Sequence, residues 1–203
     1  MENKIHYYDG IFYDKFIAPN QDALFRIIKT MIPEGSTILD VGTGTGRLPF
    51  QFAERSEFIL GLDLSSWNIS VAEKKRKKAG IENIQFVHGS ILNINELTDK
   101  HFDFAVTTFV LHEMPHQLRI DALKKMREVA DKIIIGDYKV PVPKGFAGLS
   151  VNVVEFLAGP DHFKNFRDYV KRGGVYALAK DAGLKIVKEN SNRLPHASVF
   201  VLE

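Results

Sequence analysis

Three glycines at alternate positions, preceded by an acid, are the first residues in this sequence whose types and spacing could do chemistry. Gly42, Gly44 and Gly46 follow a short apolar stretch, and Asp40 lies two residues before the first of them. A glycine-rich turn between a buried strand and a helix lets a ligand approach the backbone closely. The G-x-G-x-G spacing is one residue shorter than that of dinucleotide sites, and an acid is poorly suited to a pyrophosphate. The carboxylate of Asp40 instead suits a ligand with positive charge.

A second acid stands at the end of the next apolar run. Asp63 lies near the end of the stretch 58–64, at about the distance from the glycines at which doubly wound folds place a ribose-binding carboxylate. A carboxylate can accept two hydroxyl bonds at once, so it fits a vicinal diol. The alternative is a helix cap, but Ser65 can cap the following helix and leave Asp63 free for a ligand.

Asp40-x-Gly-x-Gly-x-Gly46 closely resembles motif I of the class I S-adenosylmethionine-dependent methyltransferases. The resemblance covers nearly the whole chain, is specific at the first two motifs and looser elsewhere. It is nearest to small-molecule enzymes of the ubiquinone/menaquinone biosynthesis type. It implies the cofactor S-adenosylmethionine (SAM), the product S-adenosylhomocysteine, and in-line methyl transfer to a small-molecule acceptor. The implied cofactor-binding residues are Asp40, Gly42, Thr43, Gly44, Gly46, Asp63, Leu64, Ser90, Ile91, Thr108, Phe109 and Tyr13.

Ser90 departs from the family pattern, because the family usually has an acid there that binds the adenine amino group. A hydroxyl can still accept one hydrogen bond.

Two histidines are candidates for a catalytic base, which is needed only if the acceptor keeps its proton at neutral pH. The pair Leu111-His112 follows the fourth predicted strand, as a similar pair often does in the family, so His112 is the first candidate. The alternative is a neutral imidazole bonded to loop backbone. His162 is the second candidate, because the family commonly builds acceptor specificity after the fifth strand. Further candidates for acceptor contacts are Phe163, Phe166, Arg167 and Tyr169.

The stretch 112–116 also fits the zinc-protease pattern H-E-x-x-H. That pattern needs both histidines on one face of a continuous helix. Pro115 belongs in a first helical turn, so the helix should begin near residue 115 and leave His112 in the preceding loop. We therefore expect no metal site.

The apolar patterns place these residues on an α/β framework. Strands are expected at 38–41, 58–64, 84–88, 102–109, 132–138, 185–188 and 198–202, and helices at 24–31, after 46, at 65–80, 115–129 and 176–182. The first of these helices should be capped by Asn20 or Asp22. With the resemblance, this predicts a Rossmann-like, doubly wound, seven-stranded sheet, mostly parallel with an antiparallel last strand and helices on both faces.

The expected organisation is one methyltransferase domain over 1–203. Residues 1–32 hold an aromatic N-terminal segment and a helix, either a lid over the active site or simple packing, and 141–175 form a helical insertion after the fifth strand.

Composition limits which binding partners and which cellular compartment we expect for this protein. Cysteine is absent, which excludes disulfides, thiolate metal sites and a cysteine nucleophile. No signal peptide and no membrane-spanning run is visible, so we expect a cytoplasmic monomer or homodimer. Net charge is +2, and the basic run 74–78 fits a solvated helix end better than a nucleic-acid patch. The alternatives left open are an RNA or protein methyltransferase, a non-catalytic SAM-binding protein and, more remotely, a NAD enzyme.

Overall fold

The structure, a computed structural model, describes residues 18–191 and 194–203. Tyr13 and most of the predicted N-terminal aromatic segment lie outside the described residues. The strands are β1 (Thr37–Val41), β2 (Phe58–Asp63), β3 (Ile84–His88), β4 (Phe102–Thr108), β5 (Ala130–Tyr138), β6 (Ile186–Asn190) and β7 (Ala197–Leu202). The α-helices are α2 (Ala18–Lys29), α3 (Arg47–Phe52), α4 (Ser66–Ala79), α5 (Ile94–Leu97), α6 (His116–Val129), α7 (Phe146–Leu157), α8 (Pro160–Arg172) and α9 (Gly174–Ala182). Short 3₁₀ turns are η1 (Ala53–Arg55), η2 (Ile91–Asn93) and η3 (Leu111–Glu113).

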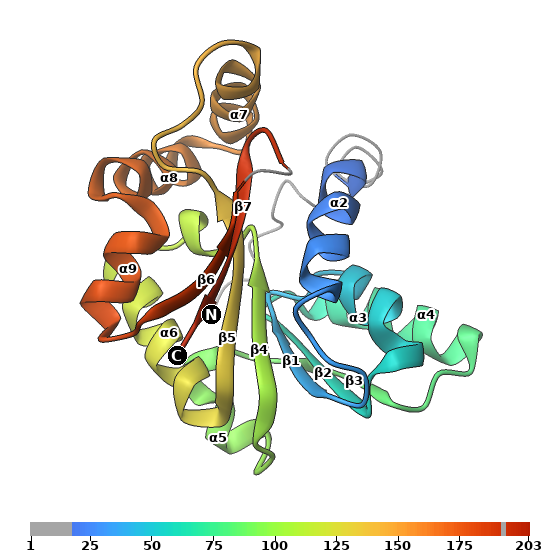
Figure 1. Cartoon of the computed structure of the whole chain (residues 1–203). Coiled ribbons are helices and arrows are strands. Elements are labelled where there is room, and N and C mark those ends of the chain that lie inside the picture. Colours follow the sequence, from blue (N-terminus) through green and yellow to red (C-terminus); the bar gives the residue numbers. More distant parts are fainter. Residues whose placement is uncertain (1–17, 192–193) are drawn as a thin grey trace.

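The strands form a seven-stranded sheet in the order β3-β2-β1-β4-β5-β7-β6 (Figure 1). The pairs from β3 to β5 are parallel, whereas β7 runs antiparallel to both β5 and β6. This confirms the predicted doubly wound sheet with an antiparallel last strand.

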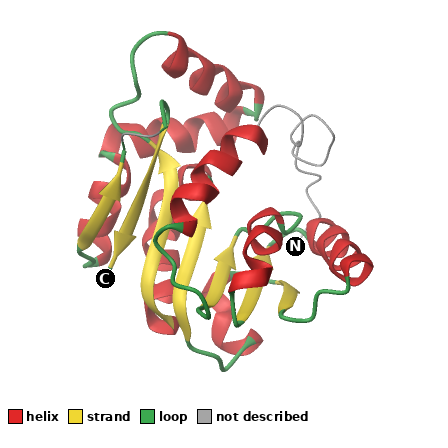
Figure 2. Cartoon of the chain, turned by 45° about the vertical axis from the view of Figure 1, so that its right-hand side comes forward, coloured by secondary structure: helices red, strands yellow, loops and turns green. Residues whose placement is uncertain are grey.

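Helices cover both faces of the sheet, as Figures 1 and 2 show, and each face has its own apolar core. Helices α2, α3 and α4 pack on one face, and their buried side chains include Leu24, Ile28, Leu48, Phe52, Ile69 and Ala72. Helices α6 and α9 pack on the other, through Ile120, Leu123, Met126, Val175 and Leu178. Burying both faces explains why the central strands read as continuous apolar runs rather than as alternating patterns.

Strand β1 lies at the point where the winding of the chain reverses. The chain passes from β1 to β2 and β3 on one side, then crosses to β4 and β5 on the other. In open α/β sheets, ligands bind outside the carboxyl ends of the strands at such a reversal, because the connections on the two sides lead away from each other. The sheet order therefore places the candidate site beside the end of β1.

Most predicted helix boundaries are confirmed by their caps. The side chain of Ser65 accepts a hydrogen bond from the amide of Asn68 at the start of α4. Gly80 ends that helix in the left-handed conformation, at φ 64°. Helix α6 begins at His116, directly after Pro115, as expected.

The predicted start of the first helix is wrong. Helix α2 is described from Ala18 onward, so Asn20 and Asp22 lie inside it and do not cap its start. Asp22 instead accepts hydrogen bonds from Arg47 at the start of α3, at 2.8 Å in the shorter contact.

Gly46 is one of two glycines of the turn after β1, with Gly42, that combine a positive φ with no room for a Cβ. Its φ is 83°, and a Cβ there would meet the rings of Phe86 and Phe50. We expect Gly46→Ala to lower the free energy of unfolding by about 2–4 kcal/mol, combining left-handed strain with overpacking. The control is Gly35→Ala, which has φ 77° and open space around the added atom, and should lose only about 1–2 kcal/mol. Urea unfolding measures both, and equal losses would contradict the packing argument.

Candidate active site

The glycine turn follows the carboxyl end of β1 and is hydrogen-bonded to the carboxyl end of β2. The amides of Gly42 and Thr43 donate to the carbonyl of Leu62, and the amide of Gly44 donates to Oδ2 of Asp63 at 2.8 Å. Gly44 has φ 56°, and no atom lies within 4 Å of the position that a Cβ would take. The turn therefore offers bare backbone to a ligand at this edge of the sheet.

Asp63 is more engaged than the sequence predicts. Besides the bond to Oδ2 from Gly44, its Oδ1 accepts from the backbone amide of Ser65 at 2.8 Å and lies 3.4 Å from the side-chain nitrogen Nδ2 of Asn68. Ser65 caps α4 as expected, and its backbone amide in addition holds the Asp63 carboxylate. Each carboxylate oxygen has two lone pairs, so Oδ2, with its single bond from Gly44, can still accept a ligand hydroxyl, whereas Oδ1 already has two contacts. The backbone bonds fix the carboxylate in place.

Asp40 lies almost fully buried at the end of β1, without a cationic partner among the described contacts. Burial disfavours its charged form and, with the nearby negative charge of Asp63, raises its pKa to about 7. A ligand with a positive charge near this edge would favour the ionised carboxylate. A bound cation would therefore stabilise the ionised carboxylate of Asp40.

The residues predicted to lie beside an adenine gather at the ends of β2 and β3. Leu64 is 74% exposed directly after β2. The hydroxyl of Ser90 accepts from the amide of Leu92, which leaves its own proton for another acceptor. Ile91 is buried in the core beneath.

The end of β4 adds two more predicted residues, Thr108 and Phe109. Phe109 has φ 55°, a left-handed conformation that is uncommon for a bulky side chain and recurs at functional sites. Its amide donates to the carbonyl of Gly136 on β5, and its ring packs 5.3 Å from the ring of Tyr138. The hydroxyl of Thr107 is buried without a hydrogen-bond partner among the described residues.

These features fit SAM. The open backbone at Gly44, the fixed carboxylate of Asp63, the buried acid Asp40 and the unpartnered hydroxyl of Thr107 all lie toward the carboxyl ends of β1, β2 and β4. A diol, an ammonium group and a sulfonium match these groups in charge and hydrogen bonding.

His112 sits in η3, beside this edge, in a buried pair with an acid. Its Nδ1 lies 2.6 Å from Oδ1 of Asp137 at the end of β5, and its amide donates to Oδ2 of the same carboxylate. Its Nε2 lies 3.5 Å from Oε1 of Glu155 on α7. Burial opposes an imidazolium here, but the charges of both acids outweigh it and raise the pKa of His112 well above its usual value. The two carboxylates therefore favour the imidazolium form of His112.

A second histidine extends the cluster. His162 on α8 lies 3.3 Å from Oε2 of Glu155 through Nδ1 and 3.2 Å from Oε2 of Glu113 through Nε2. Burial again opposes its charge, and the two carboxylates raise its pKa to about 9. The hydroxyl of Tyr138 donates to Oε1 of Glu155 at 2.9 Å. Both predicted catalytic histidines are thus brought to one polar cluster.

Four members of this cluster were not among the predicted site residues: Glu113, Asp137, Tyr138 and Glu155. Burial disfavours a charged Glu155, yet hydrogen bonds from the histidines and Tyr138 lower its pKa to about 2. The sequence did contain a signal for Asp137 and Tyr138, because both lie at the end of a buried strand, where parallel sheets bind ligands. Glu155 had a weaker one, as the only charged residue of an otherwise uncharged helix.

Arg119 of α6 holds the turn that presents His112. Its guanidinium is fully buried and donates to the carbonyl of Leu111 at 2.9 Å and, on α8, to the carbonyl of Asn165 at 2.6 Å and to Asp168 at 3.0 Å. Three fixed donors thus tie η3 to α8, which the planar guanidinium can do and an ammonium cannot.

The H-E-x-x-H pattern does not form a helical metal site. His112 belongs to η3 and contacts Asp137, whereas His116 starts α6 and lies 3.4 Å from Asp181. Among the described residues, no group of three or more His, Asp or Glu has the arrangement of a metal site.

Comparison with known proteins decides the family. Residues 32–142 match the model of the methyltransferase domain. The chain belongs to the class I SAM-dependent methyltransferases. It is 34% identical to the demethylmenaquinone methyltransferase of Bacillus subtilis over 84% of this chain and 79% of that protein. It is 37% identical to that of Bacillus velezensis, over 63% of this chain but only 59% of that protein.

Solved structures show the same fold. A SAM-dependent methyltransferase from Aquifex aeolicus superposes with a TM-score of 0.63 at 18% identity, covering 91% of this chain and 92% of that one. Magnesium protoporphyrin IX methyltransferase from Synechocystis, with S-adenosylhomocysteine bound, also gives 0.63, at 16% identity, covering 100% and 89%.

In this methyltransferase, not every residue predicted to contact the acceptor faces the cluster. Phe166 and Tyr169 are buried, and the ring of Phe166 packs 5.6 Å from that of Tyr138. Arg167 is exposed and lies over the ring of Phe163. Phe166 can therefore shape the site from behind, while Arg167 points outward.

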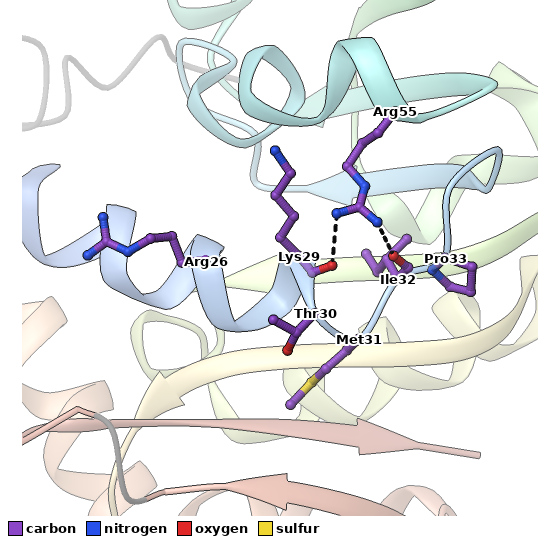
Figure 3. A pocket seen from close by; sticks show the side chains of 7 residues that line it. All are labelled: Arg26, Lys29, Thr30, Met31, Ile32, Pro33 and Arg55. Atoms are coloured by element: carbon purple, nitrogen blue, oxygen red, sulfur yellow. Dashed lines mark hydrogen bonds between the residues drawn. The ribbon is translucent and has the colours of Figure 1, made fainter.

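A pocket of about 590 Å³ lies away from the methyltransferase site (Figure 3). Its lining comes from the end of α2, the loop before β1 and the residues before β2, and consists of Arg26, Lys29, Thr30, Met31, Ile32, Pro33 and Arg55. Arg55 closes one side by donating to the carbonyls of Lys29 and Ile32. The pocket thus lies at the amino ends of the strands, and no predicted site residue lines it.

The raised pKa of Asp40 makes the stability of the methyltransferase depend on pH. A carboxyl group with a raised folded-state pKa contributes stability below its unfolded pKa and loses it as pH rises to about 7. We expect wild type to lose up to about 1.4 kcal/mol per pH unit relative to Asp40→Asn between pH ~4 and ~7, and no more above that. Urea unfolding of both proteins without ligand measures the difference. Parallel curves would show that Asp40 ionises normally.

Proposed function

We propose that this chain transfers a methyl group from SAM to a small-molecule acceptor that loses a proton during the reaction. This proposal depends on one observation, which is that a candidate ribose-binding group and a candidate base lie at the same edge of the sheet. The carboxylate of Asp63 lies at the end of β2, and the His112–Asp137 pair lies at the ends of β4 and β5.

The proposal assigns the cofactor to the residues around the glycine turn. Asp63 would accept the ribose hydroxyls, Asp40 would favour the ammonium end, and Leu64, Ser90 and Ile91 would flank the adenine. The remaining cofactor contacts would come from Gly42, Thr43, Gly44, Gly46, Thr108 and Phe109. Bound there, SAM supplies an activated methyl group on a sulfonium, so the protein's main task is to position the acceptor.

His112 is the proposed base. Asp137 on Nδ1 orients the ring and leaves Nε2 toward the cluster, the arrangement that orients catalytic histidines in general. The raised pKa means that the ring must first lose its proton before it can accept one. His162 remains the second candidate, and the bonds of both rings to Glu155 offer a route by which the proton can move between them.

A ring-bearing acceptor fits the surroundings of this cluster. The half-buried rings of Phe109, Tyr138 and His196 lie within 6.4 Å of one another, centroid to centroid. The relatives named above act on demethylmenaquinone, so a reduced naphthoquinone without the ring methyl is the first acceptor to assay. Methyl transfer to its ring carbon forms a C–C bond, breaks the S–C bond of the sulfonium and releases one proton.

The proposal includes a cytoplasmic monomer or homodimer without a nucleic-acid substrate. Within the described residues, no helix is long and apolar enough to cross a membrane. The cations of the basic run 74–78 have separate surroundings. Lys75 is hydrogen-bonded to Thr45, and Arg76 pairs with Glu73. Lys77 and Lys78 lie in the last turn of α4, before the amino end of β3. The run does not surround the proposed site.

Cofactor binding provides the first test. In calorimetric titrations with SAM and S-adenosylhomocysteine, we expect wild type to bind and Asp63→Ala to bind at least tenfold more weakly, about 1.4 kcal/mol. Ser65→Ala is the matched control, because it removes the α4 cap beside the site but keeps the carboxylate. Binding by wild type without turnover of any acceptor would favour a non-catalytic SAM-binding protein. Failure of the folded wild type to bind either ligand would refute the proposal.

The pH dependence of methyl transfer tests His112. A base with a raised pKa is available only after deprotonation, so kcat should rise with pH through an apparent pKa above the usual histidine value and then level off. His112→Gln should abolish this rise and lower kcat by at least a hundredfold. His162→Gln is the comparison variant. A wild-type rate that is independent of pH across the neutral range would remove His112 from the role of base.

A further inference from the structure

Helix α7 has two faces of opposite character. Glu155 and Val151 are buried against the site, and Glu155 bonds Tyr138 and His162. On the other side of the helix, the exposed large side chains are all apolar: Leu149 at 62%, Val153 at 48%, Phe156 at 66% and Leu157 at 60%. Their spacing of four, three and one residues places them on one helical face.

This face lies at an end of the molecule. Helix α7 packs on α8, and α8 packs on η3, so α7 is the outermost layer above the carboxyl ends of the strands (Figure 1). The helix contains no lysine, arginine or aspartate, and its one acid points inward. A cluster of exposed apolar side chains this dense marks an interaction surface rather than ordinary surface composition.

Positive charge borders the apolar face. Besides Arg172, which pairs with Asp168, the exposed cations next to α7 and along α8 are Lys144, Lys164, Arg167 and Lys171. The border is continuous with the apolar face, because the ring of Phe156 packs 5.6 Å from that of Phe163, and Arg167 lies over the ring of Phe163 at 5.8 Å.

The acidic residues of α7 and α8 do not neutralise the positive charge of this border. Asp168 is already paired with Arg119 and Arg172. Asp161, in the first turn of α8, is the remaining exposed acid of these two helices. The surface therefore keeps a positive excess around an apolar centre.

We propose that α7 and the basic border of α8 dock this protein on the surface of a bilayer containing anionic phospholipids. Apolar side chains on one helical face, bordered by lysine and arginine, are the pattern by which helices lie in the membrane interface. Anionic headgroups attract the border, and the acyl boundary receives the apolar side chains. A second copy of this chain would bring the same positive charge, which opposes pairing through this face.

The docked orientation would set the bilayer one helix away from the polar cluster. Glu155 faces the cluster from the same helix whose opposite face would touch lipid. This arrangement does not depend on the identity of the methyl acceptor, and the binding experiment below uses no acceptor and no cofactor.

Vesicle sedimentation of the full chain tests the proposal. We expect binding to vesicles of phosphatidylglycerol and phosphatidylcholine in equal parts, and at least tenfold weaker binding to phosphatidylcholine alone. The double variant Phe156→Ser/Leu157→Ser should weaken binding to the anionic vesicles at least tenfold. The matched control is Leu118→Ser/Val187→Ser, which removes exposed apolar side chains of α6 and β6 and should bind like wild type.

The basic border is tested in the same way. Lys164→Gln/Arg167→Gln should weaken binding several-fold and reduce its dependence on salt, whereas Lys180→Gln/Lys188→Gln, which removes exposed lysines of α9 and β6, should change neither. Circular dichroism checks that each variant is folded. Failure of wild type to bind anionic vesicles would overturn the proposal, whether the face is covered by the residues before Ala18 or by a second copy. Light scattering distinguishes those two outcomes.

Discussion

The parallel run of β1, β2, β4 and β5 is the constraint on which this protein's site depends. Strands that run the same way end at the same edge, so Asp40, Asp63, Thr108 and Asp137 meet although they are far apart in the sequence. The reversal of winding at β1 opens that edge to a ligand, because the helices on either side lead away from it. The antiparallel β7 pairs with β5 and places Ala197 next to Tyr138, and β6 forms the edge of the sheet beyond it.

Two acids are buried at this edge in different ways. Asp137 is paired with the imidazole of His112 at 2.6 Å, so its burial stabilises a positive charge nearby. Among the described residues, Asp40 has no cationic partner, and burial raises its pKa to about 7. An unpaired buried acid is costly when ionised, and a bound cation relieves that cost. The first acid therefore organises the protein's own groups, and the second suits an added ligand.

The helices after β5 connect the site to the surface. Arg119 ties α8 to the turn that holds His112, and Glu155 ties α7 to both histidines through hydrogen bonds. The polar side of α7 is thereby fixed, which leaves its apolar side facing outward. Polar satisfaction at the site and an unpartnered apolar surface are two consequences of the same packing.

The sequence by itself determined the strands, most helix ends and the family. Continuous apolar runs specify buried parallel strands, and the acid-flanked glycines specify the turn at β1, because these signals are local. The boundary of α2 was misplaced, since Asp22 pairs with Arg47 from a distant segment instead of capping its own helix. Only the tertiary structure decided the partners of His112 and His162, because Asp137 and Glu155 reach them across long stretches of chain. It also decided that Asp63 is held by Gly44 and Ser65, and that α7 turns its apolar side outward, because charge pairing and burial depend on which elements pack together.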